Sequence, residues 1–157
     1  MLLKKLYIVT GKGGVGKTMT ALALSKALEK SSSKKVFYTS FDTPADDDLC
    51  KSVGVTPINY SIQSSTVEYI GRKLGSETIA KWIMKAPFFK ALFNIVPSLG
   101  YMITLGHIID TLEDRDDMII VCDAPSSGHI LTVLESPKSF NQIFKTGALV
   151  KDIHRML

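Results

Sequence analysis

The chain has 157 residues, which is the size of one globular domain of roughly 150 residues. Hydrophobic residues make up 45% of it and charged residues 22%, which excludes a disordered or low-complexity protein and allows a packed core. The two cysteines, Cys50 and Cys122, are far apart and form no CxxC pair, which excludes a disulfide framework and a zinc ribbon. Because the N-terminus also lacks the apolar core and cleavage site of a signal peptide, we predict a cytoplasmic protein.

The net charge of +4 is concentrated near the N-terminus. Residues 1–40 contain eight lysines and one acid, Glu29, whereas residues 41–157 contain eleven basic and fourteen acidic residues. Such a basic segment is compatible with nucleic-acid binding. However, most of these lysines either flank predicted strands or belong to a glycine-rich motif at residues 11–18, so we expect no nucleic-acid partner.

The first three predicted elements alternate between strand and helix. Residues 5–10 are a short run of apolar, β-prone side chains that stops at Gly11, which predicts a fully buried strand. Residues 17–30 have apolar side chains at helical spacing, in a stripe formed by Ala21, Leu22, Leu24, Ala27 and Leu28. Residues 35–41 form a second apolar run that ends at Asp42 and predicts a second strand.

The region at about 64–115 is predicted to be a helical subdomain, preceded by a short strand near 58–62. Capping residues and prolines give start and stop signals for its helices. These signals predict a helix from the capping box Ser65-Thr66-Val67-Glu68 to about Lys73, one from Ser76 to near Pro87, and one from Ser98, after Pro97, to about Glu113.

An uncharged run extends from Ala91 to Ile109, about the length that spans a bilayer. It contains Asn94, Pro97 and His107, which a lipid-exposed helix tolerates poorly. Helices buried beside the sheet are the simpler interpretation, and an apolar surface that binds a client or partner is the alternative.

The last predicted strand is Met118–Cys122, which ends at Asp123. After it, Ser136 and Pro137 are placed as the cap and the first residue of a helix in the segment that ends at Leu157. Buried strands separated by helices pair in parallel through right-handed crossovers. We therefore predict an α/β fold with a doubly wound, mainly parallel sheet and a helical insertion between the second and third strands.

The most specific motif follows the first predicted strand and reads Gly11-Lys12-Gly13-Gly14-Val15-Gly16-Lys17-Thr18. It satisfies GxxxxGK[ST] between a strand and a helix, the context of a phosphate-binding P-loop. Its glycines let backbone N–H groups surround a phosphate, and the helix start at Met19 adds a donor and a positive dipole end. Lys17 can reach the β- and γ-phosphates, and Thr18 can offer its hydroxyl to Mg²⁺. The motif predicts a P-loop NTPase with ATP and Mg²⁺ as cofactors.

The same glycines, Gly11, Gly13 and Gly16, also satisfy the dinucleotide fingerprint GxGxxG, with Asp42 at the place of its ribose-binding acid. Lys17 and Thr18 distinguish the two interpretations. A pyrophosphate at a helix N-terminus needs no lysine there, whereas a triphosphate with a metal ion does. The sequence therefore favours a nucleoside triphosphate.

The second lysine of the motif, Lys12, makes GKGGVGKT resemble the deviant Walker A sequence of the MinD, ParA and arsenite-pump ATPases. This resemblance implies a homodimer in which Lys12 reaches the partner's nucleotide and takes part in catalysis together with Lys17. The alternative is that Lys12 is a solvated loop lysine.

The segment Ser40-Phe41-Asp42-Thr43-Pro44-Ala45-Asp46 resembles switch I of the arsenite-pump and tail-anchored-protein-targeting ATPases. The resemblance implies that Asp42 polarises the attacking water. Thr43 and Asp46 depart from the family pattern, which is roughly S-T-D-P-A-H. The adjacent acids Asp46, Asp47 and Asp48 could form a metal cluster, but capping of a helix start is the commoner use of such acids.

The third strand leads into Asp123-Ala124-Pro125-Ser126-Ser127-Gly128-His129, which resembles switch II of the same ATPases. An aspartate at the end of a hydrophobic strand is the Walker B arrangement, so Asp123 is predicted to hold Mg²⁺ directly or through water. The resemblance implies that Gly128 offers its N–H to the γ-phosphate. It also implies that His129 transmits the position of this loop to the helices behind it. The alternative is that His129 caps the next helix.

We predict one P-loop ATPase domain over residues 1–157, which we expect to be the N-terminal part of a longer family domain. The resemblance implies a Mg²⁺-dependent, homodimeric switch that handles an anion, a hydrophobic client protein or a membrane-associated partner. Two alternatives remain. One is a MinD/ParA-like positioning ATPase that acts on a membrane or DNA surface, and the other is a nucleotide-binding regulatory module without turnover.

Overall fold

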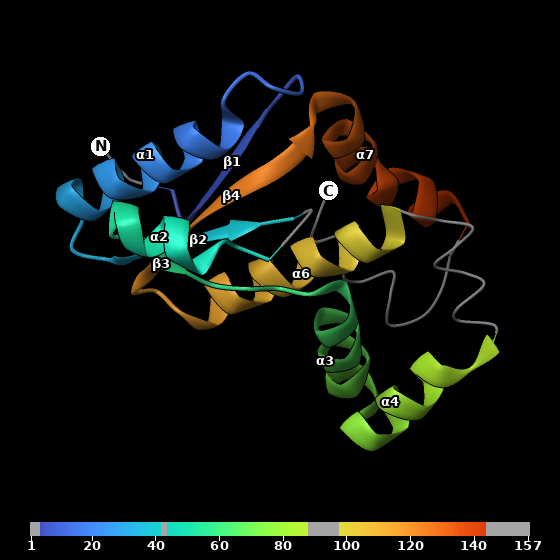
Figure 1. The fold of residues 1–157 in the computed structure, drawn as a ribbon. Coiled ribbons are helices and arrows are strands. Elements are labelled where there is room, and N and C mark those ends of the chain that lie inside the picture. The colour runs from blue at the N-terminus through green and yellow to red at the C-terminus, as the bar shows by residue number, and fades with distance from the viewer. Residues whose placement is uncertain (1–3, 42–43, 88–97, 144–157) are drawn as a thin grey trace. The chain divides into compact units, whose positions relative to one another are not determined.

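The computed structural model describes residues 4–41, 44–87 and 98–143 and divides into two compact units (Figure 1). The first unit consists of Met1–Tyr60 and Ile109–Ile130, and the second of Ser61–Ile108 and Leu131–Leu157. In the described residues, the first unit holds the sheet and the second is helical. The assignment of the whole chain to one ATPase domain stays a prediction.

The first unit is built around a parallel sheet with the strand order β1-β4-β2-β3. Its strands are β1 (Leu6–Gly11), β2 (Lys35–Ser40), β3 (Thr56–Pro57) and β4 (Met118–Ser126). Helix α1 (Lys17–Ser31) connects β1 to β2, and α2 (Asp47–Val53) leads into β3. The predicted α/β fold with a parallel sheet is confirmed. Because Gly11 pairs with Ser126 and Ser40 with Asp123, the carboxyl ends of β1, β2 and β4 share one edge.

The core of this unit lies between α1 and the sheet, and Figure 1 shows α1 running beside β1 and β4. Strand β4 is buried along almost its whole length because β1 and β2 flank it, as its continuous apolar sequence indicates. On the α1 side, the helix contributes Ala21, Leu22 and Leu28, which pack with side chains from the strands, among them Val36, Tyr38, Ile119 and Val121.

Two predictions about the strands need correction. The first strand is half-buried and not fully buried, because β1 lies at one end of the described strand order and has a single neighbour there. The third strand does not end at Cys122, because β4 continues past Asp123 to Ser126 by pairing with the end of β1. The extension places Asp123 inside the ladder, where neighbouring strands fix its backbone.

The second unit contains α3 (Ile62–Leu74), α4 (Glu77–Lys85) and most of α6 (Ser98–Asp114) and α7 (Ser127–Ile143). Helix α6 packs closely on α3, because a Cβ added at Gly100 would lie 2.7 Å from Cγ2 of Ile62. His107 joins the same two helices through Ser65 Oγ at 3.0 Å and Glu68 Oε2 at 2.9 Å. Both contacts lie inside the second unit.

The helices predicted at 17–30, 76–87 and 98–113 are confirmed with small changes of boundary. The predicted strand near 58–62 is wrong, because β3 ends at Pro57 and the chain then enters α3. The capping box at Ser65 is also wrong. Ser61 caps α3 by accepting from Ser64 N–H, so Ser65 lies inside the helix.

The helix predicted to start at Pro137 is wrong as well. The chain turns from β4 directly into α7 at Ser127, and the helix runs through Pro137. No helix in the described ranges is both long and apolar enough to cross a bilayer. Within the uncharged run, residues 91–97 lie outside the described residues, and Ser98–Ile109 belongs to α6.

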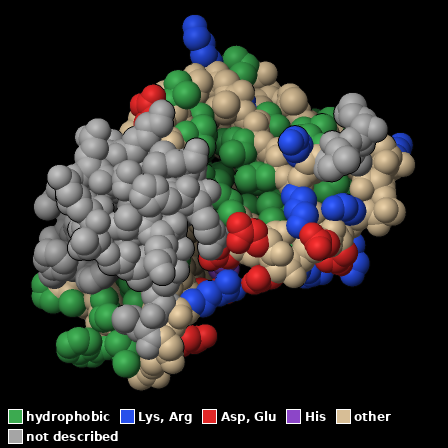
Figure 2. All heavy atoms as spheres, turned by 180° about the vertical axis from the view of Figure 1, so that it is seen from behind, with side chains coloured by type: hydrophobic (Ala, Val, Ile, Leu, Met, Phe, Trp, Pro, Cys, Tyr) green, Lys and Arg blue, Asp and Glu red, His purple; other side chains and the backbone are tan. Residues whose placement is uncertain are grey.

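Many charged side chains of the first unit are paired. Ion pairs join Lys5 to Asp116, Lys26 to Glu29 and Arg115 to Asp117, and Lys5 Nζ also donates to the carbonyl oxygen of Leu112 at 2.8 Å. Figure 2 shows one face of the molecule on which basic and acidic side chains lie next to one another. Part of the N-terminal basic charge is therefore balanced locally.

Candidate functional site

The glycine-rich loop connects the carboxyl end of β1 to the first turn of α1. Gly16 is the N-cap of α1 with φ 87°, in the left-handed region that favours glycine, and no described side chain caps this helix. A Cβ added at Gly13, Gly14 or Gly16 would meet no atom within 4 Å. The loop therefore leaves open space beside it, and the free N–H groups of the helix start remain available to a ligand.

Two lysines of this loop, Lys12 and Lys17, concentrate positive charge there. Neither Lys12 nor Lys17 forms an ion pair with a described residue, and the first turn of α1 contains no acid. The stem of Lys17 lies beside the loop's entry, since a Cβ at Gly11 would be 3.9 Å from Lys17 Cγ. Together with the positive end of the α1 dipole, these lysines favour binding of an anion such as a polyphosphate.

Asp123 joins α1 to the sheet at the edge where the loop lies. Its Oδ2 accepts a hydrogen bond of 2.5 Å from Thr18 Oγ1 and one of 3.3 Å from the Tyr38 hydroxyl. Asp123 is 8% exposed, and its Oδ1 is buried without a hydrogen-bond partner among the described residues. Thr18 and Asp123, the two residues predicted to hold Mg²⁺, thus lie within hydrogen-bond distance of each other, and their role toward a metal ion stays a prediction.

This donor set suits Mg²⁺. A buried carboxylate oxygen without a partner costs free energy until a cation or a donor reaches it, and the Thr18 hydroxyl lies next to the same carboxylate. Mg²⁺ prefers oxygen ligands and is commonly held by one or two protein groups together with substrate phosphates. Within the described ranges, no cluster of three or more His, Cys, Asp or Glu side chains could hold a metal ion.

A pocket of about 100 Å³ opens beside Asp123 in the first unit. It is lined by residues of β2, α1, α2, β4 and the segment before α2: Thr18, Tyr38, Ser40, Pro44, Ala45, Asp46, Leu49, Cys50 and Asp123. Burial, and then the Asp123 carboxylate, raise the pKa of Tyr38 well above its usual range, so its hydroxyl stays a hydrogen-bond donor. Tyr38 is a site residue that the sequence did not reveal, because it lies within an apolar strand run.

The two cysteines are poor nucleophiles. Burial, and then the charge of Asp123, raise the pKa of the Cys122 thiol to about 12. Burial, and then Asp47 and Asp46, raise the pKa of Cys50. Both thiols are therefore protonated near neutral pH, and the chemistry of the site rests on oxygen and nitrogen groups.

The predicted switch I lies only partly within the described residues. Asp42 and Thr43 are outside them, so the catalytic role of Asp42 stays a prediction. Asp46 caps α2 by accepting from Asp48 N–H and Leu49 N–H at 3.0 Å. This confirms helix capping for Asp46, and Asp47 and Asp48 lie in the first turn of α2, where the helix dipole favours acids.

The predicted switch II, residues 123–129, begins inside β4 and continues without a break into α7. Thr10 Oγ1 donates to the carbonyl oxygen of Pro125 at 2.8 Å and ties this segment to the strand before the glycine loop. Gly128 and His129 lie exposed in the first turn of α7. Because α7 begins at Ser127, the alternative that His129 caps this helix is wrong. The roles of Gly128 and His129 toward phosphate stay predictions.

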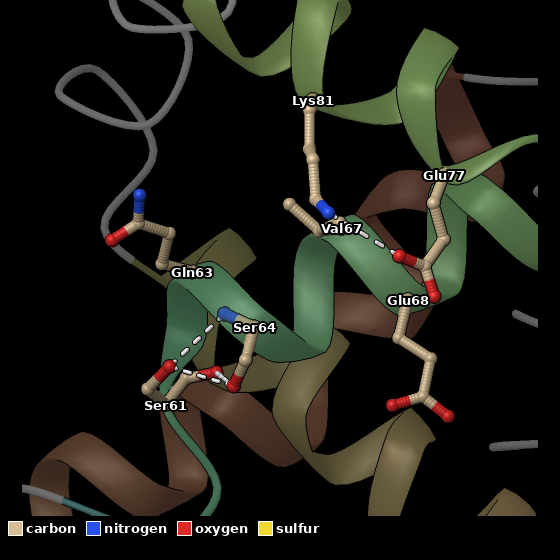
Figure 3. A pocket seen from close by; sticks show the side chains of 7 residues that line it. All are labelled: Ser61, Gln63, Ser64, Val67, Glu68, Glu77 and Lys81. Atoms are coloured by element: carbon tan, nitrogen blue, oxygen red, sulfur yellow. Dashed lines mark hydrogen bonds and ion pairs between the residues drawn. The ribbon is translucent and has the colours of Figure 1, made fainter.

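A second and larger cavity, of about 530 Å³, lies in the helical unit at α3 and α4 (Figure 3). Its charged groups are already paired: Lys81 lies 3.3 Å from Glu77, and Glu68 pairs with Arg72 and His107. In contrast to the glycine loop, this cavity offers no uncompensated charge to a ligand among the groups named here. We therefore place the functional site at the edge of the sheet.

Comparison with family models identifies the family of the chain. Residues 3–135 match the model of the AAA_31 family, which is described as an AAA domain. The chain belongs to this family. AAA_31 domains are P-loop NTPases of the ParA/MinD type, and the match includes the glycine loop, both strands that deliver Tyr38 and Asp123, and the start of α7. No curated protein matched the chain. The AAA_31 assignment does not distinguish the arsenite-pump branch from its relatives.

Proposed function

We propose that this protein is a Mg²⁺-dependent ATPase that acts as a nucleotide-controlled switch. The observation that carries the proposal is the juxtaposition, at one sheet edge, of Lys17, a helix N-terminus and the buried Asp123 carboxylate, where no described residue pairs with the lysine or caps the helix with its side chain. Each group complements one part of a metal–triphosphate: the lysine and N–H groups complement phosphate oxygens, and the carboxylate complements the cation.

In the proposed mechanism, backbone N–H groups of residues 13–19 hold the β- and γ-phosphates, and Lys17 neutralises their charge. Thr18 and Asp123 hold Mg²⁺, which when bound supplies further positive charge to the phosphate oxygens. Asp42 orients the attacking water, a role that rests on the resemblance to switch I. Gly128 donates its N–H to the γ-phosphate, so loss of that phosphate releases the first turn of α7.

Hydrolysis by the purified chain tests this proposal. We expect phosphate release from ATP that requires Mg²⁺ and stops when EDTA is added. Nucleotide binding without any turnover would instead support the regulatory module, and absence of nucleotide binding would overturn the assignment. Measuring the mass in solution on the same sample shows which oligomer is active.

A homodimer is part of the proposal. Lys12 is exposed, and two apolar side chains close to it in the sequence are exposed as well, Val15 at 62% and Met19 at 60%. Exposed apolar side chains in the same segment as a lysine that has no ion-pair partner among the described residues suit a surface that a second copy covers once nucleotide is bound. In that dimer Lys12 reaches the phosphates held by the partner.

Replacing Lys12 with alanine is expected to prevent ATP-dependent dimerisation while leaving the fold intact, because the side chain is exposed and forms no ion pair within the described ranges. Sedimentation velocity with Mg²⁺ and a non-hydrolysable ATP analogue measures the dimer. The matched control is Lys30→Ala, which removes an exposed lysine from the other end of α1. If Lys12→Ala dimerises like the wild type, Lys12 does not act across an interface.

Within the ParA/MinD-type family, we place the chain in the arsenite-pump and tail-anchored-targeting branch. The spacing from Asp123 to Gly128-His129 supports this branch by resemblance. Helix α4 also exposes Trp82 at 74% and Ile79 at 48%, which supports a hydrophobic client protein or a membrane-associated partner in the cytoplasm.

The alternative is a positioning ATPase that acts on a membrane or DNA surface, and the match to a family of the ParA/MinD type supports it. Cosedimentation with anionic liposomes and binding to duplex DNA distinguish the two. Binding that appears only with ATP and weakens with salt would support the positioning function. Binding to an apolar peptide, but not to DNA or liposomes, would support the client-binding branch.

A further inference from the structure

The side chain of Tyr38 extends from the core of the first unit into the site. Its ring belongs to the cluster that packs α1 on the sheet, and the residue is 4% exposed. Its hydroxyl lines the pocket beside Asp123 and donates to Asp123 Oδ2 at 3.3 Å. A tyrosine can place a polar group at a defined point in this way while its ring remains packed in apolar surroundings.

Asp123 Oδ2 thus receives hydrogen bonds from two elements, Thr18 of α1 and Tyr38 of β2. A carboxylate held through one oxygen by a single donor can still turn about its Cβ–Cγ bond. A second donor on the same oxygen, from a different direction, restricts that rotation. The other oxygen, Oδ1, is then left buried and without a partner among the described residues.

We propose that Tyr38 is a positioning residue for the Mg²⁺ site: its hydroxyl holds the Asp123 carboxylate so that Oδ1 faces the cation. This inference rests on the proposed function, because it assumes that Asp123 serves a cation. Tyr38 touches neither the phosphates nor the metal ion and acts only through Asp123. Removing a residue that hydrogen-bonds to a metal-holding group commonly lowers the metal affinity by about 10- to 100-fold.

Tyr38→Phe separates this role from packing, because it removes the hydroxyl and keeps the ring in the core. The probe is Mn²⁺, whose binding to the chain in the presence of ADP is followed by electron paramagnetic resonance. We expect Tyr38→Phe to raise the dissociation constant for Mn²⁺ about tenfold, at the lower end of the usual range because the 3.3 Å contact is long. ADP affinity in EDTA should equal that of the wild type.

The matched control is Tyr7→Phe, on the same face of the sheet, where a half-buried tyrosine of β1 packs against the cluster. It should leave both affinities unchanged, and thermal unfolding of both variants shows that the fold is kept. If Tyr38→Phe binds Mn²⁺ as tightly as the wild type, the inference is overturned while the proposed function stands. An equal loss of ADP affinity in EDTA would show a merely structural role and also overturn it. If the wild type itself binds no Mn²⁺ with ADP, the proposed function fails together with the inference.

Discussion

Replacing Lys17 with alanine is expected to lower ATP turnover by about 100- to 1,000-fold, the loss typical of removing one preorganised group that stabilises developing charge. The stem of Lys17 lies beside Gly11, and its ammonium forms no ion pair with a described residue, so its charge is available to a phosphate. Alanine leaves the open loop and the helix N-terminus intact. Phosphate release at saturating ATP and Mg²⁺ measures the effect.

The control for Lys17→Ala is Lys30→Ala, which removes the same charge from the last turn of α1, where a lysine is favoured by the helix dipole. This variant should keep wild-type turnover. Calorimetric measurement of ADP binding shows whether Lys17→Ala has lost nucleotide affinity or only the ability to hydrolyse bound ATP. Turnover retained by Lys17→Ala would show that the glycine loop is not the catalytic phosphate site.

Replacing Asp123 with asparagine should keep or raise the stability of the free protein and should lower its ATP turnover. In EDTA, the free energy of unfolding should stay the same or rise by about 1 kcal/mol, because the variant removes a buried negative charge with an unpaired oxygen. Thr18 and Tyr38 can still donate to the amide oxygen. With Mg²⁺ and ATP, turnover should fall by about 100-fold, because a neutral amide is a weak ligand for a hard cation.

Urea unfolding in EDTA, and again with Mg²⁺ and ADP, tests both parts of this prediction. The wild type should gain stability from Mg²⁺ with ADP through binding to the folded state, and Asp123→Asn should lose most of that gain. Asp48→Asn is the control, because Asp48 is fully exposed and lies 4.0 Å from Lys51, so its loss should change stability little. An equal Mg²⁺-dependent gain in Asp123→Asn would remove Asp123 from the metal site.

The parts of the fold that depend on the pattern of neighbouring residues along the chain were predictable. The apolar runs of β2 and β4 and the stripe of α1 each bury one continuous set of side chains, so periodicity alone located them. The glycine loop was predictable for a related reason. Its residue types are dictated by backbone conformation, as the positive φ of Gly16 shows, and by the charge of the ligand.

Predictions that depended on distant partners failed. Ser65 has the sequence signature of a helix cap, yet Ser61 begins α3 and Ser65 contacts His107 of α6. Pro137 has the signature of a first helical residue, yet α7 starts at the end of β4. A local signal states where a helix can begin, and packing with other elements decides which of the possible starts is used.

The sequence by itself determined the α/β class and the position of the glycine loop with its two lysines and its threonine. These features are local, because a strand, a turn and a helix start follow one another along the chain. Only the tertiary structure decided that Thr18 and Tyr38 share one oxygen of Asp123 and leave the other without a partner. Those residues are far apart in the sequence, and the parallel pairing of β2 with β4 under α1 brings them together.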